Sequence, residues 1–235
     1  MNEPEWKDLD NLEWKRAIPL IEKLTITPTK DNGLVTIGSL PAELECVGLG
    51  TDAAVFVYTA LPQYAFKVYA AGKEEKRKNE EQAYQKLKNH PSFPAFYGTG
   101  DRYIVISYEA GTTLYDCLVL GIEIPPWVIE KVDEAIAYAR KVGLNPRDIH
   151  LKNIILQDKS IKLIDVSEYV QPGNDERWDH LKEGYRLYYP FIASRKIPSE
   201  WIEFAKEQYK KHKMLAFSAK AFVRWLTSFP LKDSH

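Results

Sequence analysis

Long apolar runs are missing from this chain, and its isoleucine- and leucine-rich stretches are only strand-sized, so we expect no membrane-spanning segment. Cysteine is scarce: Cys46 and Cys117 provide neither a disulfide framework nor a metal-binding spacing. Free thiols and a charged N-terminus without a signal pattern favour a reducing cytoplasm. An excess of either charge is also lacking, with 32 Lys and Arg against 33 Asp and Glu. That balance argues against a large sequence-independent nucleic-acid surface, and we expect no nucleic-acid partner.

The first half of the chain has the pattern of a small β-rich unit. Within residues 5–23, Trp6 and Trp14 recur at helical spacing, which predicts an amphipathic helix that either packs on this unit or presents a partner surface. Residues 73–88 predict a charged helix with one apolar face. Pro62-Gln63 is typical of a turn between two strands. The expected strands cover residues 34–37, 44–47, 54–59, 64–69 and 103–107.

The second half, after about Gly111, has mainly helical patterning. Residues 127–142 carry one apolar stripe, and Gly143 follows at the position that a left-handed helix cap requires. Two short apolar segments with a turn between them predict a hairpin over residues 154–164. We therefore expect an α+β fold. Further helices are expected at residues 113–120, 175–188, 199–211 and 218–227.

The most informative residues flank this hairpin. Asp148 precedes it, Asn153 comes five residues later at its start, and Asp165 closes its second strand. An uncompensated carboxylate at the end of an apolar strand is costly, so Asp165 is more than a turn former. One carboxylate can orient and deprotonate a hydroxyl group, while an amide oxygen and a second carboxylate can hold Mg²⁺ against a triphosphate. This arrangement resembles the phosphoryl-transfer centre of protein kinases.

A glycine-containing turn precedes this centre in the chain. The residues from Gly48 through Gly50 to Val55 resemble the glycine-rich phosphate loop Gly-x-Gly-x-x-Gly-x-Val, with Ala53 at the third glycine position. Glycine lets backbone amides approach phosphate oxygens without a Cβ in the way. Alone, two glycines between strands more often indicate an ordinary hairpin.

Lys67 stands alone within an otherwise apolar strand that follows the glycine turn. In isolation, a solvent-facing lysine on an edge strand is the ordinary interpretation. A lysine that binds phosphates needs a carboxylate partner from the next helix, and both Glu80 and Glu81 could provide it. Glu80 is preferred, because the apolar residues three, four and seven positions later share its helix face.

The order of these features over residues 43–181 resembles the protein-kinase-like superfamily, particularly its compact bacterial and RIO-type members. The resemblance implies a two-lobed α+β fold that binds ATP with Mg²⁺ in a cleft beneath the glycine loop. It implies a small antiparallel N-lobe with one helix over residues 34–110 and a mainly helical C-lobe over residues 111–235. The first forty residues have no assigned counterpart in the family, and the helical spacing noted above makes residues 1–33 an expected helical extension. ATP and a protein or small-molecule hydroxyl acceptor are the implied partners.

The same resemblance assigns roles to individual residues. Asp148 matches the catalytic base, and Asn153 and Asp165 match the metal ligands. Ile106 would gate the adenine pocket, and the backbone of Ser107 and of Glu109 would hydrogen-bond the base. The implied catalytic residues are Asp148, Lys67, Glu80 and His150. The implied nucleotide-binding residues are Gly48, Gly50, Val55, Lys67, Ile106, Ser107 and Glu109.

Several positions depart from the family pattern. Pro146 stands where a histidine is usual, and Val166-Ser167 replaces Phe-Gly, which removes the familiar aromatic switch. His150 stands where serine/threonine protein kinases usually carry lysine and where small-molecule kinases often carry histidine. Lys152 either supplies the missing charge or faces solvent. Asp179 is either a buried aspartate that braces the catalytic loop or an ordinary surface acid.

Three functions are compatible with these residues. The favoured one is an ATP-dependent phosphotransferase that acts on Ser or Thr hydroxyl groups of a protein. The second is a kinase of the same fold with a small hydroxylated acceptor, as in aminoglycoside and choline kinases. The third is a nucleotide-binding pseudokinase that acts as a partner module, which the departures motivate and the intact metal ligands oppose. The sequence leaves the acceptor, the oligomeric state and the regulator open.

Overall fold

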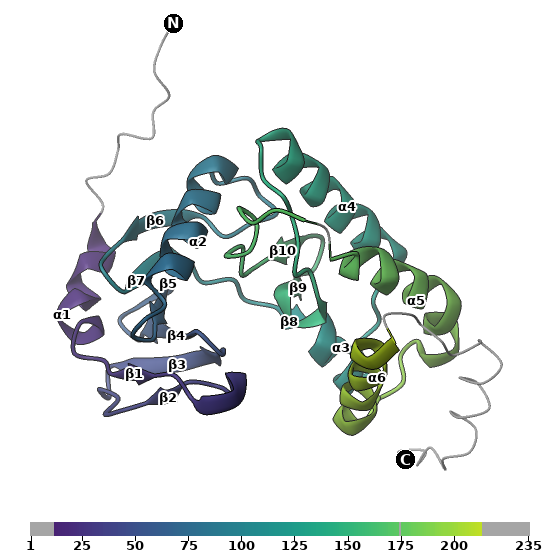
Figure 1. The fold of residues 1–235 in the computed structure, drawn as a ribbon, viewed down its shortest axis with the longest axis horizontal. Helices are drawn as coiled ribbons and strands as arrows, with labels where there is room; N and C mark the ends of the chain where they lie inside the picture. The colour runs from purple at the N-terminus through teal and green to yellow at the C-terminus, as the bar shows by residue number, and fades with distance from the viewer. Residues whose placement is uncertain (1–11, 174, 213–235) are drawn as a thin grey trace, which may run out of the picture. The chain divides into compact units, whose positions relative to one another are not determined.

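The computed structural model describes residues 12–173 and 175–212, which contain six α-helices and three antiparallel sheets (Figure 1). The α+β class expected from the sequence is confirmed. The chain divides into two compact units. The first runs to Glu109 and takes in Val166–Val170, and the second comprises Ala110–Asp165 and resumes at Gln171. Within the described ranges, no helix is long and apolar enough to cross a membrane.

A five-stranded antiparallel sheet with the strand order β3-β4-β5-β7-β6 is the centre of the first unit. The turn expected at Pro62-Gln63 is wrong, because Tyr58 pairs with Leu61 and the chain reverses between them. Residues 62–64 then form a bulge within β5, where a proline that cannot donate to the strand ladder is tolerated. The strands are β3 (Leu44–Leu49), β4 (Ala53–Tyr58), β5 (Leu61–Tyr69), β6 (Phe96–Thr99) and β7 (Tyr103–Ser107).

The N-terminal segment packs its apolar side chains on one face of this sheet. Of the helix expected over residues 5–23, the described part is a 3-10 helix over Glu13–Ala17 that runs directly into a short α-helix over Ile18–Ile21, with Pro19 in the first turn of the α-helix. Trp6 lies outside the described residues, and Trp14 is buried in the shared core. Of the strand expected at residues 34–37, only β2 is present. The segment comprises η1 (Glu13–Ala17), α1 (Ile18–Ile21), β1 (Ile26–Thr27), η2 (Lys30–Asn32) and β2 (Thr36–Ile37).

The opposite face of the sheet is covered by α2 (Glu74–Leu87), which confirms the helix predicted at residues 73–88. Side chains alternate along β5. Phe66 therefore joins the core with the N-terminal segment, while Lys67 and Tyr69 reach a side chain of α2. The strand period thus places Lys67 beside the helix that supplies its partner.

The second unit is mainly helical and contains the predicted hairpin, in which β9 pairs with β10 and Leu163 lies opposite Ile154. The strand β8 pairs with the other edge of β9. Gly143 has a φ of 77°, so the expected left-handed cap is confirmed. The helix expected at residues 218–227 lies outside the described residues. The elements are β8 (Thr112–Thr113), α3 (Leu114–Leu120), α4 (Pro126–Lys141), η3 (Leu151–Asn153), β9 (Ile154–Leu156), β10 (Ile161–Leu163), α5 (Arg177–Ile192) and α6 (Ser199–His212).

The contact between Trp14 and Gly98 tests how tightly the N-terminal segment is packed. A Cβ atom at residue 98 would lie 2.8 Å from Cζ2 of Trp14. Gly98→Ala should therefore lower the free energy of unfolding by about 1–3 kcal/mol through overpacking, and Trp14→Ala should lower it by about 3–5 kcal/mol. In the double variant the added methyl group has room, so most of the cost of Gly98→Ala should disappear. Urea denaturation measures these free energies, and strictly additive effects would contradict the contact.

Candidate active site

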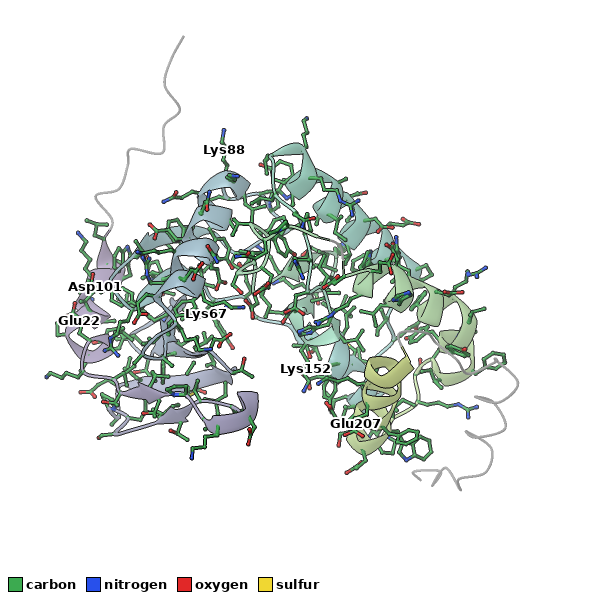
Figure 2. All side chains as sticks on the ribbon, in the orientation of Figure 1. Glu22, Lys67, Lys88, Asp101, Lys152 and Glu207 are labelled. Atoms are coloured by element: carbon green, nitrogen blue, oxygen red, sulfur yellow. The ribbon has the colours of Figure 1, made fainter. Side chains whose placement is uncertain are left out.

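Lys67 and Glu80 form a buried ion pair within the first unit; Figure 2 labels Lys67. Nζ of Lys67 lies 2.6 Å from Oε2 of Glu80, whose side chain is 0% exposed. Glu81 pairs instead with Arg77 of the same helix, at 2.6 Å. Glu80 is therefore the glutamate that partners Lys67, as the helix-face argument predicts.

Tyr69 is a third member of this cluster. Its hydroxyl group donates a hydrogen bond to Oε2 of Glu80, and Nζ of Lys67 lies 5.6 Å from the centroid of its ring. A buried carboxylate is costly unless hydrogen bonds and an opposite charge compensate for the lost water. The phenol and the ammonium group together provide that compensation. Sequence reasoning missed Tyr69, although the strand period places it on the same face as Lys67.

The glycine turn forms a tight end to the β3–β4 hairpin. Gly48 lies in β3 opposite Val55 of β4. The N–H of Gly50 donates to the carbonyl of Ala53 at 2.9 Å, and the carbonyl of Gly50 accepts from the N–H of Val35 at 2.9 Å. Because both backbone groups of Gly50 are engaged, the turn is held from two sides. The sequence did not predict this use of the Gly50 carbonyl, since Val35 reaches the turn from the N-terminal segment.

The end of β7 is equally well anchored. Ile106 is 7% exposed. The N–H of Ser107 donates to the carbonyl of Ala95 at 2.8 Å, and its hydroxyl group donates to Oε1 of Glu109. The N–H of Ser107 is therefore already used inside the protein. The sequence-based expectation named the backbone of Ser107 without saying which group would bind a ligand. Because the N–H donates to Ala95, the N–H is the less suitable of the two groups.

Asp148 lies in the second unit on the loop between α4 and the hairpin. Its φ of 58° is in the left-handed region, which costs a non-glycine residue about 1–3 kcal/mol and persists only where surrounding contacts enforce it. The N–H of Asp148 donates to Oδ2 of Asp175 at 2.7 Å. The carbonyl of Asp148 accepts from Nδ2 of Asn153 at 3.2 Å. Its carboxylate oxygen Oδ1 accepts from Nη1 of Arg177.

Asn153 and Asp165 flank the open end of the β9–β10 hairpin. The N–H of Ile164 donates to the carbonyl of Asn153 at 2.9 Å, which continues the pairing of the two strands up to this point. Asn153 is 9% exposed, and its amide nitrogen is used by Asp148, which leaves the amide oxygen Oδ1 as an acceptor for a cation. Asp165 has a φ of 59° directly after the hairpin. The hairpin thus places an amide and a carboxylate at the same end of a rigid element.

Burial dominates the electrostatics of this loop. Burial raises the pKa of the Asp148 carboxyl group above its ordinary value, and the guanidinium of Arg177 opposes part of that rise. Burial also lowers the pKa of the His150 imidazole, against the attraction of Asp148. The lowered pKa favours the neutral form of the His150 imidazole, which does not replace a permanent positive charge.

Lys152 does not supply that charge to Asp148. Its Nζ lies 4.2 Å from the centroid of the Tyr115 ring and 3.5 Å from Oε1 of Glu203, so its side chain is directed toward α3 and α6 (Figure 2). The sequence left open whether Lys152 supplies the missing positive charge or faces solvent, and these contacts do not support the first possibility. Arg177, which sequence reasoning did not select, is the cation on the Asp148 carboxylate.

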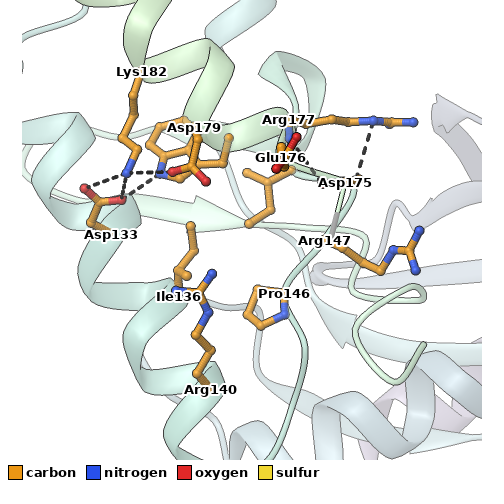
Figure 3. A pocket seen from close by; sticks show the side chains of 12 residues that line it. Asp133, Ile136, Arg140, Pro146, Arg147, Asp175, Glu176, Arg177, Asp179 and Lys182 are labelled. Carbon is orange, nitrogen blue, oxygen red and sulfur yellow. Dashed lines mark hydrogen bonds and ion pairs between the residues drawn. The ribbon is translucent and has the colours of Figure 1, made fainter. Parts of the chain in front are cut away.

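Asp175, rather than Asp179, braces the catalytic loop. A cavity of about 50 Å³ is lined by residues of α4, of this loop and of the start of α5 (Figure 3). On its wall, Nζ of Lys182 lies 3.1 Å from Asp133 and 3.2 Å from Asp179. The Asp179 side chain is 65% exposed, so it is the surface acid of the two alternatives. Asp175 is the first residue of the helix predicted at residues 175–188 and lies two residues before the observed start of α5. A hydrogen bond from such a position to a distant loop leaves no local sequence signal.

Comparison with known proteins places the chain in a family. No protein-family model matches it. The chain is 36% identical over 190 residues to a protein of Bacillus subtilis (strain 168) named "Putative serine/threonine-protein kinase YrzF". The match covers 80% of this chain and 88% of that relative, so it includes most of both proteins. The protein therefore belongs to the protein-kinase-like family that contains this relative.

Proposed function

We propose that this protein is an ATP- and Mg²⁺-dependent phosphotransferase that moves the γ-phosphate of ATP to a hydroxyl group, most readily of Ser or Thr in a protein. One observation carries the proposal: Asp148 is fixed by hydrogen bonds to Asp175 and Asn153, beside a hairpin that ends in Asn153 and Asp165. The name of the Bacillus subtilis relative, which specifies a serine/threonine-protein kinase, supports the protein acceptor.

Asp148 acts as the general base in this proposal. Its carboxylate orients the acceptor hydroxyl group and takes up the proton while the hydroxyl oxygen attacks the γ-phosphorus. The N–H of Asp148 donates to Asp175, and the carbonyl of Asp148 accepts from Asn153, so the backbone that carries the carboxylate is fixed. A carboxylate positioned in advance needs no reorganisation at the moment of proton transfer, which favours catalysis.

Asn153 and Asp165 would hold Mg²⁺. This cation prefers oxygen ligands and usually takes only one or two protein side chains, with phosphates and water completing its shell. An amide and a carboxylate fit that set, and the described residues contain no group of three or more His, Cys, Asp or Glu that could hold a metal unaided. When bound, the cation would neutralise negative charge on the phosphate oxygens.

The first unit would bind the rest of the nucleotide. Lys67, fixed by Glu80, would contact the α- and β-phosphates as a compact positive charge. The turn with Gly48 and Gly50, together with Val55, would cover the phosphates. Ile106 would gate the adenine site, with Ser107 and Glu109 offering backbone groups to the base. A two-lobed kinase domain with its lobes over residues 34–110 and 111–235 belongs to the same proposal.

A small hydroxylated acceptor is the second candidate, and His150 is the residue that favours it. Its neutral imidazole stands two residues after Asp148, where a permanent cation would suit a protein kinase. Transfer of labelled γ-phosphate in a whole lysate, read by gel and by thin-layer chromatography, distinguishes the two acceptors. Label in protein bands supports the first candidate, and label confined to small products supports the second.

Asp148→Asn tests the assignment of the general base. The substitution removes the proton acceptor but keeps the size of the side chain, so γ-phosphate transfer should fall by about 10²–10⁴-fold. Stabilisation by Mg-ATP should remain, because the variant keeps the proposed phosphate and metal contacts. Asp179→Asn, at an exposed acid of α5, is the matched control and should behave as wild type. Near-normal transfer by Asp148→Asn would show that Asp148 is not the base.

Lys67→Ala tests nucleotide binding by the first unit. Mg-ATP at 100 times its dissociation constant should stabilise the wild type by about 2.7 kcal/mol, which corresponds to several degrees in melting temperature. Lys67→Ala should lower the melting temperature without ligand, because it removes the ion-pair partner of buried Glu80, and should reduce the response to Mg-ATP. Lys78→Ala, on the exposed side of α2, should do neither.

Thermal-shift titration of the three proteins measures both effects. A full Mg-ATP response in Lys67→Ala would exclude the proposed phosphate contact. Absence of any response in the wild type at millimolar nucleotide would instead favour a pseudokinase that acts as a structural partner.

A further inference from the structure

Arg177 places a guanidinium group directly on the carboxylate of Asp148. Nη1 of Arg177 donates a hydrogen bond to Oδ1 of Asp148. Nε of Arg177 lies 3.5 Å from Oδ2 of Asp175, and its backbone N–H donates to Oδ1 of Asp175 at 3.3 Å. Asp175 also accepts a hydrogen bond from the N–H of Asp148. The carboxylate of Asp175 therefore fixes the backbone of both Asp148 and Arg177.

Other cationic side chains around the loop, within the part of the chain that the structure describes, are directed elsewhere. Lys152 lies against α3 and α6. Arg147 donates to the carbonyl of Pro172. Lys182 is held between two carboxylates on the wall of the cavity, as the dashed lines in Figure 3 show. Arg177 is thus the cation that the fold brings to Asp148.

Stability alone does not account for this pair. The side chains of Arg177 and Asp148 are 46% and 32% exposed, and an ion pair so accessible to water contributes only about 0–1 kcal/mol. The left-handed backbone of Asp148 costs about as much or more. A half-exposed guanidinium on an aspartate with a left-handed backbone is therefore better explained by chemistry at that position than by folding.

We propose that Arg177 is a catalytic residue that donates hydrogen bonds to the non-bridging oxygens of the γ-phosphoryl group during transfer; this inference rests on the proposed function. The acceptor oxygen forms a bond to the γ-phosphorus while the bond from phosphorus to the bridging oxygen breaks. ADP leaves with that electron pair, and the hydroxyl proton goes to Asp148. Arg177 places positive charge beside the proton acceptor and beside the oxygens that carry the negative charge.

The guanidinium group suits two simultaneous contacts. It has five N–H donors in a plane, whereas an ammonium group is a single compact charge without a planar fork. The hydrogen bond from Nη1 to Asp148 uses one donor of Arg177, so other donors of the same group can meet phosphoryl oxygens while the first contact is kept. Arg177→Lys should accordingly retain the charge but not the geometry.

The test compares full-length Arg177→Ala, Arg177→Lys and Asp148→Asn with the wild type, and uses Lys182→Ala as the control cation of the same helix. The rate of γ-phosphate loss from Mg-[γ-³²P]ATP is measured with myelin basic protein as the acceptor probe. For Arg177→Ala we expect kcat to fall by about 10³-fold or more, with the KM for ATP near its wild-type value. Arg177→Lys should recover part of the rate. Millimolar guanidinium ion, far below denaturing concentrations, should restore part of the kcat of Arg177→Ala.

Several results would overturn this proposal. An unchanged or raised kcat in Arg177→Ala would mean that the guanidinium is dispensable or masks the base. A loss of kcat that guanidinium ion does not restore would indicate a structural role. If Asp148→Asn is inactive while Arg177→Ala is normal, only the role of Arg177 fails. If both variants keep the wild-type rate, the assignment of Asp148 as the base fails as well. Absence of any γ-phosphate transfer by the wild type would contradict the proposed function itself.

Discussion

The carboxylate of Asp175 is the group on which the geometry of the catalytic loop depends. It accepts the N–H of Asp148 through one oxygen and the N–H of Arg177 through the other. The first bond holds Asp148 in a left-handed conformation that the backbone would otherwise leave. The carbonyl of Asp148 then accepts from Asn153, at the entrance of the hairpin. Asp148, Arg177 and Asn153 are in this way tied into one small hydrogen-bond network.

In the first unit too, a single carboxylate fixes its neighbours through hydrogen bonds, here the carboxylate of Glu80. Glu80 has no exposed surface, and its carboxylate receives hydrogen bonds from Lys67 and Tyr69. Removing one partner from a buried charge costs more than the contact itself contributes, so each member fixes the others. Lys67 is therefore held in place by Glu80. In both units, hydrogen bonds fix a charged side chain in position, and preorganisation of this kind is what stabilises developing charge in enzymes.

Local patterns predicted the parts of the structure that depend on neighbours in sequence. Strand alternation around Lys67, the face of α2 that carries Glu80, the cap at Gly143 and the hairpin after Asn153 all follow from such patterns. The features that the sequence did not predict correctly depend on contacts between residues far apart in the chain, or on residue types that fit two local structures equally well. Asp175 was missed because its partner is 27 residues away, and the bulge at residues 62–64 was read as a turn because proline fits both. For Lys152 the sequence left two alternatives open, because its partner Glu203 comes from α6, 51 residues away.

The Mg²⁺ dependence of γ-phosphate transfer by Asp165→Asn tests the central claim most directly, which is that the end of the hairpin holds the cation against the nucleotide. The Mg²⁺ concentration for half-maximal rate should rise by about tenfold or more, because even residues that only support a metal ligand have effects of that size. Asp158→Asn, at the exposed turn at the opposite end of the same hairpin, should keep the wild-type dependence. A wild-type Mg²⁺ dependence in Asp165→Asn would contradict the account.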